Sequence, residues 1–197
     1  TANVTKECSE LDIKLIYFST NYVYPGIKGN YSENDCLLPV NNYAWSKLGG
    51  ECSVHLYQNS LIVRVCMTEK PFLHKSAFVN VNSSFMYHEE VAKILFKLID
   101  KKGIINIGGK SQYIYDFAKK GNKKVKKSFL KKNAKIGMPF DSSINTKKLK
   151  KIRSKNNLFF PDKKKLNIES FKSIKNYLNK IKPDILIHLA GLSRPMS

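Results

Sequence analysis

The chain has 197 residues, of which 42% are hydrophobic and 11% aromatic, and this is enough to build one α/β domain with a sizeable core. Such a composition argues against disorder over most of the length. Lys and Arg number 35 against 15 Asp and Glu, a formal net charge of +20 that favours a polyanionic partner. Only three of these basic residues are Arg, the residue that grips phosphates and bases in two-point contacts. We therefore interpret the charge as a solvated lysine surface and do not expect a nucleic-acid partner.

The four cysteines form no C-x-x-C pair and have no histidine at metal-ligand spacing, so we expect no metal site. No run approaches the roughly 18 apolar residues of a membrane span, and no charged start followed by an apolar core marks a signal peptide. We therefore expect a reduced, cytoplasmic protein without a membrane partner.

In chain order, the first third of the sequence alternates helical and strand patterns. Residues 1–11 have the spacing of the end of an amphipathic helix, and the apolar run at 14–19, KLIYFS, predicts a buried strand. A loop rich in Pro and Gly follows at 24–42, and then a helix is expected over 42–58. The next buried strand is LIVRVC at 61–66.

The middle of the chain continues this alternation. Residues 91–99 have helical spacing, residues 103–107 are strand-like, and a helix is expected over 113–120. The run at 119–135 is basic and poorly periodic, which predicts an exposed segment.

The last forty residues predict an amphipathic helix over 171–181, stopped by Pro183, and a buried strand, ILIHL, at 185–189. Helices that alternate with continuous apolar strands indicate a parallel sheet covered on both faces.

The strongest candidate site combines STNYVY at 19–24, the end of a strand, with YAWSK at 43–47. Residues four apart share a helical face, so Tyr43 and Lys47 can point at one ligand. A phenol has an unperturbed pKa of about 10, and a nearby cation brings it toward the working range of a proton donor. Thr20 can hydrogen-bond the same substrate oxygen, because ligands bind at strand ends in open α/β sheets. A bare Tyr-x-x-x-Lys is more often a surface pair, so the context decides.

The runs FSTNYVYPG and YSENDCLLPVNNYAWSKLGGE resemble the extended short-chain dehydrogenase/reductase family, within it the dTDP-4-dehydrorhamnose reductase branch. The branch pattern is S-T-D-Y-V-F-D-G followed by Y-x-E-x-D-x-x-x-P-x-N-x-Y-G-x-S-K-x-x-G-E. Asn21 replaces the usual acid and Ala44 the usual Gly. The residues that fall on the second part of the pattern are Glu33, Asp35, Pro39, Asn42, Tyr43, Ser46, Lys47, Gly50 and Glu51.

The resemblance implies an α/β fold, a Rossmann-type doubly wound parallel sheet that is incomplete, with a small substrate-binding lobe. Residues 1–66 and 157–197 would form the partial dinucleotide-binding domain, and residues 67–152 mainly the substrate-binding lobe and the C-terminal part. The segment 157–197 resembles a part that precedes residue 1 in family order. The chain is therefore either circularly permuted or a fragment whose pieces stand out of natural order.

In the resembled fold the strands at 14–19 and 185–189 are consecutive. We therefore predict that they pair in parallel, with the strand at 61–66 on the other side of the first. The family opens with a G-x-x-G-x-x-G turn that lets the pyrophosphate approach a helix N-terminus, and these 197 residues contain no such run. We therefore expect a cofactor site that is only half represented.

The resemblance also implies an activity, NAD(P)H-dependent reduction of a 4-keto group on a nucleotide-linked deoxysugar. Tyr43 would supply the proton, Lys47 would lower its pKa and hold the nicotinamide ribose, and Thr20 would orient the carbonyl oxygen. The other expected contacts are Ser19, Ala190 and Gly191 for the cofactor, and Asn21, Ser193 and Arg194 for the substrate.

Three alternatives stay open. A nucleotide-sugar epimerase or dehydratase of the same family shares the Tyr and the Lys, a non-catalytic basic module would bind nucleic acid through residues 119–135, and an inactive reductase fragment would do neither. The expected partner is a nucleotide-sugar substrate, and a homodimer is a possibility. The sequence does not choose between NADH and NADPH.

Overall fold

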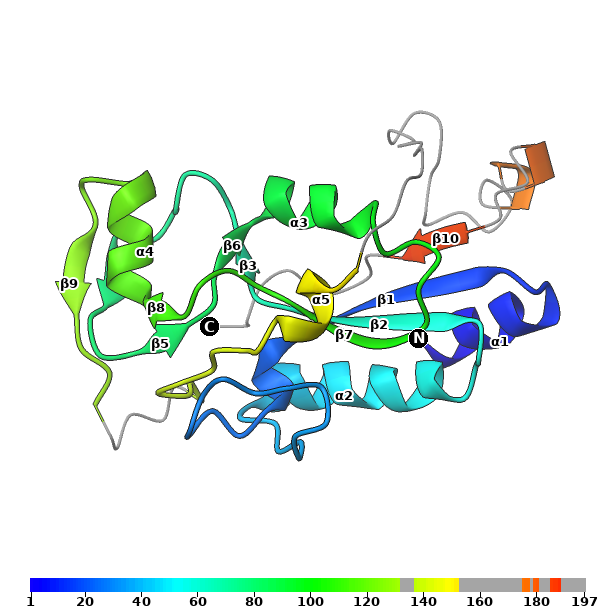
Figure 1. Ribbon diagram of the computed structural model, residues 1–197, viewed down its shortest axis with the longest axis horizontal. Helices are drawn as coiled ribbons and strands as arrows, with labels where there is room; N and C mark the ends of the chain where they lie inside the picture. Colours follow the sequence, from blue (N-terminus) through cyan, green and yellow to red (C-terminus); the bar gives the residue numbers. More distant parts are fainter. Residues whose placement is uncertain (132–136, 153–174, 178, 181–184, 189–197) are drawn as a thin grey trace.

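The centre of the molecule is a four-stranded, fully parallel sheet in the order β10-β1-β2-β7 (Figure 1). The computed structural model describes residues 1–131, 137–152, 175–177, 179–180 and 185–188. The strands of this sheet are β1 (Lys14–Thr20), β2 (Ser60–Val65), β7 (Gly103–Ile107) and β10 (Ile185–His188).

Both predictions of strand pairing are confirmed. Strand β10 pairs in parallel with β1, Lys14 lying opposite Ile185, and β2 pairs with the other edge of β1, Leu15 lying opposite Ser60. All seven residues of β1 are buried, as expected of a parallel strand covered on both faces.

One face of the sheet is covered by α1 (Ala2–Glu10) and α2 (Asn42–His55). Leu15 and Tyr17 of β1 point to this face and pack with Val54 of α2. Because successive side chains of a strand alternate, the neighbouring residues of β1 must serve the other face.

The opposite face is covered by α3 (His88–Leu95) and the short α5 (Lys147–Lys150), and Figure 1 shows α3 on the side of the sheet away from α2. Ile16 and Phe18 of β1 pack there with Leu95. Helices on both faces of a parallel sheet confirm the prediction of a Rossmann-type α/β fold.

A smaller lobe lies beyond the carboxyl ends of the sheet strands, at the left of Figure 1. It is built around α4 (Ile114–Gly121), whose buried face carries Phe117 and Ala118. Its core is separate from that of the sheet and comprises Phe72, Ala77, Val81, Ile114, Phe117, Ala118, Val125 and Leu130. The short strands that complete this part of the chain are β3 (Met67–Thr68), β4 (Ser76–Phe78), β5 (Asn82–Ser83), β6 (Met86–Tyr87), β8 (Gln112–Tyr113) and β9 (Lys126–Ser128).

The prediction of an exposed segment over residues 119–135 is wrong in part. Strand β9 pairs in parallel with β4, and the flanking Val125 and Leu130 are buried in the core of the lobe. The described lysines between Lys119 and Lys131 are exposed, as predicted. A strand that contains two exposed lysines is thus held by its pairing with β4 and by the two buried apolar residues that flank it.

The remaining elements match the predictions to within a few residues. Helix α2 ends three residues before the predicted position, and α3 begins three residues earlier than predicted. The earlier start follows from a capping box, in which the Glu90 carboxylate accepts a hydrogen bond from Tyr87 N–H at 2.9 Å. The predicted helix at 171–181 falls mostly outside the described residues, of which 175–177 and 179–180 are helical.

Two adjacent glycines of α2 differ in what surrounds them, which gives a matched test of the packing. A Cβ on Gly50 would lie 2.6 Å from Cζ of the buried Tyr17 ring, whereas a Cβ on Gly49 would meet no atom within 4 Å. We expect Gly49→Ala to raise the free energy of unfolding by about 0.5–1 kcal/mol, because alanine is the better helix former. Gly50→Ala should lower it by about 1–3 kcal/mol through overpacking. Urea denaturation of both variants checks this, and equal stabilisation by the two would contradict the packing of Tyr17 against α2.

Candidate active site

The candidate site forms where β1 ends and the chain turns. Thr20 is the last residue of β1, is 5% exposed and has an extended backbone, with φ −137° and ψ 153°. Its side-chain oxygen accepts a hydrogen bond from Tyr22 N–H at 3.2 Å, which begins the one-turn helix η1 (Asn21–Val23). The Thr20 hydroxyl is thereby fixed at the carboxyl edge of the sheet, where open α/β sheets bind their ligands.

Helix α2 carries the second part of the site, and Asn41 holds its first turn. The Asn41 Oδ1 accepts a hydrogen bond from Ala44 N–H at 2.8 Å, and its Nδ2 donates to the Gly137 carbonyl at 2.9 Å. This end of α2 is therefore anchored, and it bears Tyr43 in the first turn and Lys47 one turn later.

The Thr20 side chain acts on the Tyr43 phenol, which places the end of β1 near the start of α2. Burial raises the pKa of Tyr43, and the Thr20 side chain opposes that rise. The phenol is therefore protonated at neutral pH, the form that a proton donor needs. Tyr43 as a residue is still 40% exposed, so a ligand can reach it.

Lys47 is 7% exposed and is held by one aromatic side chain at two points. Its ammonium lies 4.5 Å from the centroid of the Tyr17 ring, and the Tyr17 hydroxyl donates to the Lys47 carbonyl at 3.2 Å. Burial lowers the pKa of Lys47, and the charge of Glu51 opposes this. Within the described part of the chain the ammonium donates no hydrogen bond, so its N–H groups are left for a ligand.

The neighbours of Thr20 in the sequence differ in their hydrogen bonding. Ser19 is 2% exposed, and among the described residues its hydroxyl has no hydrogen-bond partner. A buried polar atom without a partner is uncommon and is typical of a site that a ligand or water completes. Asn21, 3% exposed, uses its amide within the protein, since Nδ2 donates to the Ser142 carbonyl at 3.0 Å.

Four of the predicted contacts, Ala190, Gly191, Ser193 and Arg194, lie outside the described residues. The strand they would follow, β10, is next to β1, with His188 opposite Tyr17. The carboxyl end of β1, which carries Thr20, is therefore next to the carboxyl end of β10, which would carry these four contacts.

Sequence reasoning missed a buried polar network that joins α2 to β2. Arg64 and Glu51 form an ion pair with 2.8 Å between Nη2 and Oε2, and their side chains are 2% and 5% exposed. Arg64 Nη1 also donates to the Tyr24 hydroxyl at 2.9 Å, which in turn donates to Asn106 Oδ1 at 3.0 Å. One signal was available, because an arginine inside the apolar run LIVRVC has to find a buried partner.

The same network ties down the loop between β1 and α2. Asn106 N–H donates to the Glu33 carboxylate at 2.9 Å, and its amide Nδ2 donates to the Tyr31 carbonyl at 2.9 Å. Arg64 Nη1 is also 3.3 Å from the Glu33 carbonyl oxygen, which accepts from it. The loop that leads from Thr20 to Tyr43 is therefore held by β2 and β7.

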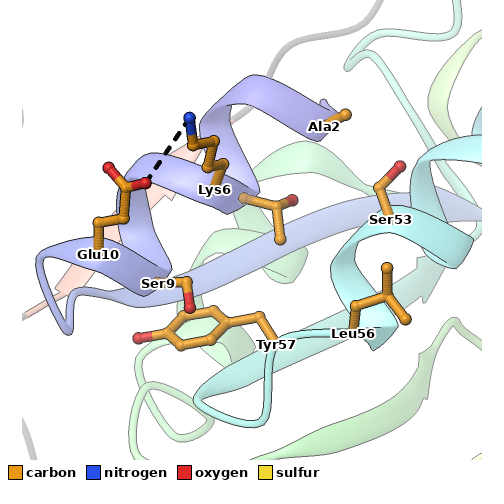
Figure 2. A pocket seen from close by; sticks show the side chains of 8 residues that line it. Ala2, Lys6, Ser9, Glu10, Ser53, Leu56 and Tyr57 are labelled. Atoms are coloured by element: carbon orange, nitrogen blue, oxygen red, sulfur yellow. Dashed lines mark ion pairs between the residues drawn. The ribbon is translucent and has the colours of Figure 1, made fainter.

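A hollow of about 400 Å³ lies elsewhere, between α1 and the far end of α2 (Figure 2). Lys6 and Glu10 of α1 form an exposed ion pair, 3.7 Å from Nζ to Oε1, along its rim. Neither Thr20, Tyr43 nor Lys47 lines it, so it is not the candidate site.

In the described residues no group of three or more His, Cys, Asp or Glu side chains could hold a metal ion. No helix in this same part of the chain is long and apolar enough to cross a membrane.

Comparison with known protein families gives a match over the first part of the chain. Residues 1–80 match the family described as RmlD substrate binding domain. Methionine adenosyltransferase 2 subunit beta from Rattus norvegicus is 39% identical over 54 residues, which are 27% of this chain and 16% of that protein. The chain thus spans a small part of this curated relative.

Two solved structures extend the likeness beyond residue 80. A hypothetical dTDP-4-dehydrorhamnose reductase from Sulfolobus tokodaii has a TM-score of 0.68 at 27% identity, over 81% of this chain and 66% of that one. A dTDP-4-dehydrorhamnose reductase from Bacillus anthracis, solved with NADP, has a TM-score of 0.62 at 25% identity, over 74% of this chain and 60% of that one. The chain therefore covers less than two thirds of either protein.

The buried ion pair makes a strong prediction for stability. Arg64→Met leaves the Glu51 carboxylate buried without its partner, and we expect the free energy of unfolding to fall by about 3–5 kcal/mol. The double variant Arg64→Met/Glu51→Met should recover most of this loss. Lys6→Met, which breaks the exposed pair with Glu10, should cost at most about 0.5 kcal/mol. Urea denaturation of the three proteins checks this, and a double variant no more stable than Arg64→Met would show that the unpaired carboxylate is not the cause.

Proposed function

Since the chain is dTDP-4-dehydrorhamnose reductase-like in sequence over residues 1–80 and in fold over most of its length, we propose that it reduces a 4-keto nucleotide-linked deoxysugar with NADPH or NADH. The observation that supports this is the arrangement of Thr20, buried at the end of β1, Tyr43 in the first turn of α2 and the buried Lys47 one turn later, with the Thr20 side chain acting on the Tyr43 phenol. This arrangement can polarise a carbonyl oxygen and protonate it.

The residues present fit the nicotinamide half of the cofactor. The Lys47 ammonium keeps its N–H donors, and the Ser19 hydroxyl is buried without a partner in the described part of the chain. Lys47 would hold the ribose hydroxyls, with Ser19 beside it at the strand end. When bound, the nicotinamide supplies the hydride. The 197 residues contain no G-x-x-G-x-x-G turn for the pyrophosphate.

In the proposed reaction each side chain has a separate task. Thr20 donates a hydrogen bond to the keto oxygen and orients it. Tyr43 transfers its phenolic proton to that oxygen as negative charge develops there, and Lys47 stabilises the phenolate that remains. Water then reprotonates Tyr43. Because Lys47 is buried, its charge acts on the phenolate with little screening by solvent.

The lobe has a hydrophobic core of its own, which supports different binding roles for the sheet and the lobe. We assign cofactor binding to residues 1–66 together with 157–197, and substrate binding mainly to residues 67–152. The lobe core around α4 is separate from the sheet and lies beyond the carboxyl ends of its strands, which is where a substrate would meet Thr20 and Tyr43.

The proton donor is tested by removing one oxygen atom. Tyr43→Phe should lower kcat by at least about 100-fold, because the proton source is lost, while NADPH binding changes little. Tyr57→Phe is the matched control, since this tyrosine lies beyond the opposite end of α2 and its hydroxyl contacts Asp12 at 3.4 Å. Turnover is measured as NADPH oxidation with dTDP-4-dehydrorhamnose. A Tyr43→Phe variant that keeps most of its turnover would show that Tyr43 is not the acid.

The half-represented cofactor site gives a second expectation. If these residues contact only the nicotinamide and its ribose, reduced nicotinamide mononucleotide and NADPH should bind the chain with dissociation constants within about threefold of each other, both weak. Fluorescence titration of the 197-residue chain with each compound measures this. A preference for NADPH of 100-fold or more would mean that other residues bind the adenosine half.

A further inference from the structure

A chain of buried polar groups runs from Asn21 across the boundary between the sheet and the lobe. Asn21 Nδ2 donates to the Ser142 carbonyl at 3.0 Å. The Ser142 hydroxyl is 3.2 Å from that of Ser83, which is 3.1 Å from the Cys66 sulfur at the end of β2. Asn21, Ser142, Ser83 and Cys66 are all at most 3% exposed. In such surroundings each hydrogen bond matters, because a broken one leaves an unsatisfied group.

The carbonyl that Asn21 contacts cannot easily move. Ser142 N–H donates to the Asn82 carbonyl at 3.1 Å, and Asn82 N–H donates to the Phe140 carbonyl at 2.8 Å. On the other side, Tyr31 N–H donates to the Ser143 carbonyl at 3.0 Å. The segment 140–143 is thus bonded to the lobe and to the loop after β1, and Asn21 is tied to a fixed point.

Asn21 is also in contact with the catalytic threonine that precedes it. The Thr20 hydroxyl lies 3.5 Å from Asn21 Oδ1 and accepts from Tyr22 N–H. The turn of η1 is therefore held at two points. Thr20, at its start, belongs to β1, and the Asn21 amide is hydrogen-bonded to the Ser142 carbonyl. If the hydrogen bond between Asn21 and Ser142 is lost, the Thr20 hydroxyl can move away from Tyr43.

We propose that Asn21 is a positioning residue that fixes the Thr20 hydroxyl by donating its amide proton to the Ser142 carbonyl, and that position 21 requires a neutral donor. Its catalytic consequence rests on the proposed function. A carboxylate at this position has only acceptor atoms and would face another acceptor, the Ser142 oxygen. The amide of Asn21 is thereby assigned to the protein rather than to the substrate.

The ionisable groups on the elements around Asn21 include Tyr22 on its own turn, Tyr43 and Lys47 on α2, Cys66 directly after β2, and Asp141 beside Ser142. Glu51 of α2 and Arg64 of β2 are paired with each other. Burial raises the pKa of Tyr22 and of Tyr43, and raises the pKa of Cys66 to about 12, so these three are neutral between pH 5 and 8. Asp141 accepts from Ser143 N–H at 3.0 Å and from the Asn82 amide at 3.2 Å. The stability of each variant is compared with that of the parent at the same pH. Groups that titrate in both proteins then contribute equally and do not affect the difference.

Asn21→Asp is the first test, because its effect should depend on pH. Burial and the facing carbonyl raise the pKa of the introduced carboxyl above its ordinary value of about 3.9 in the folded protein. Its protonated form can donate to Ser142, so the variant should approach the parent below about pH 3.9, the unfolded-state pKa. As pH rises through the raised pKa, stability is lost relative to the parent. By pH 8 we expect the unfolding equilibrium constant to exceed that of the parent by roughly 10- to 100-fold.

Amide hydrogen exchange tests positioning without any turnover. Tyr22 N–H is bonded to the Thr20 side chain, so its protection factor reports whether that hydroxyl is in place. Val63 lies in the centre of β2, so its exchange reports global unfolding, and at pH 8 it should lose only the protection that the lower stability of Asn21→Asp accounts for. Tyr22 should lose at least 10-fold more protection than Val63. Asn21→Ala, which lacks both donor and charge, should lose protection at Tyr22 at every pH.

Asn80→Asp is the matched control. Asn80 Nδ2 donates to the Leu130 carbonyl at 2.8 Å, and its Oδ1 accepts from Leu130 N–H at 2.9 Å, so the same substitution disturbs the same chemistry inside the lobe. It should lower stability with the same dependence on pH and leave the protection of Tyr22 unchanged. The kcat of Asn21→Asp, relative to the parent, should fall between pH 5 and 8 as the protection of Tyr22 falls.

Three outcomes would overturn the proposal. Parental stability and Tyr22 protection of Asn21→Asp at pH 8 would show that no donor is needed. Equal losses in Asn21→Asp and Asn21→Ala at all pH values would remove the role of the amide proton. Equal acceleration of exchange at Tyr22 and Val63 would make the effect global rather than local. If the parent shows no turnover, the proposed function fails, and the exchange experiment still decides the role of Asn21.

Discussion

The ion pair between Arg64 and Glu51 sets the position of α2 on the sheet, and the candidate site depends on that position. Both side chains are buried, and taking two charges out of water is favourable only when their geometry and remaining hydrogen bonds are nearly complete. Arg64 meets this condition through both Glu51 oxygens and the Tyr24 hydroxyl. A rotation or slide of α2 along β2 would break several of these bonds at once. The helix therefore has one well-defined register, and Lys47, one turn before Glu51, shares it.

The two halves of the site are fixed by one further segment, which is distant in the sequence. Asn41, at the start of α2, donates to the Gly137 carbonyl, and Asn21, after the end of β1, donates to the Ser142 carbonyl. Each asparagine uses its amide in the same way, as a side-chain donor to a backbone acceptor. The spacing between Thr20 and Tyr43 is thus controlled from three directions: by the sheet, by the ion pair and by residues 137–142. Two side chains on different elements can act on the same atom only with this degree of constraint, because an error of 1 Å removes a hydrogen bond.

The parts of this arrangement that sequence could predict are the ones encoded locally. The apolar run of β1 and the four-residue spacing of Tyr43 and Lys47 are local patterns, and the resemblance to a known family supplied the order of the strands. The partner of Asn21 lies 121 residues further along the chain, and no periodicity connects the two. The strand β9 was missed for a related reason, since its residues are basic and its stability comes from pairing with β4 and from two flanking side chains in the lobe core. In the sequence, long-range hydrogen bonds of this kind are indicated only by an unexpected residue type. Here Asn21 stands where an acidic residue is expected, and Arg64 stands in an apolar run.

The large positive charge of the chain and the charge of Lys47 lie in different surroundings, one exposed to solvent and the other buried. The described lysines of the lobe are exposed, and at physiological salt their field decays over a Debye length of about 8 Å. Under the proposed function they would raise the rate at which an anionic nucleotide sugar approaches, and they would have little influence on a proton transfer inside the site. Lys47 is shielded from water by the Tyr17 ring and by the helix that carries it. In the proposed reaction, the charge of this buried ammonium, which Tyr17 holds in place, would be screened less by solvent than that of the surface lysines.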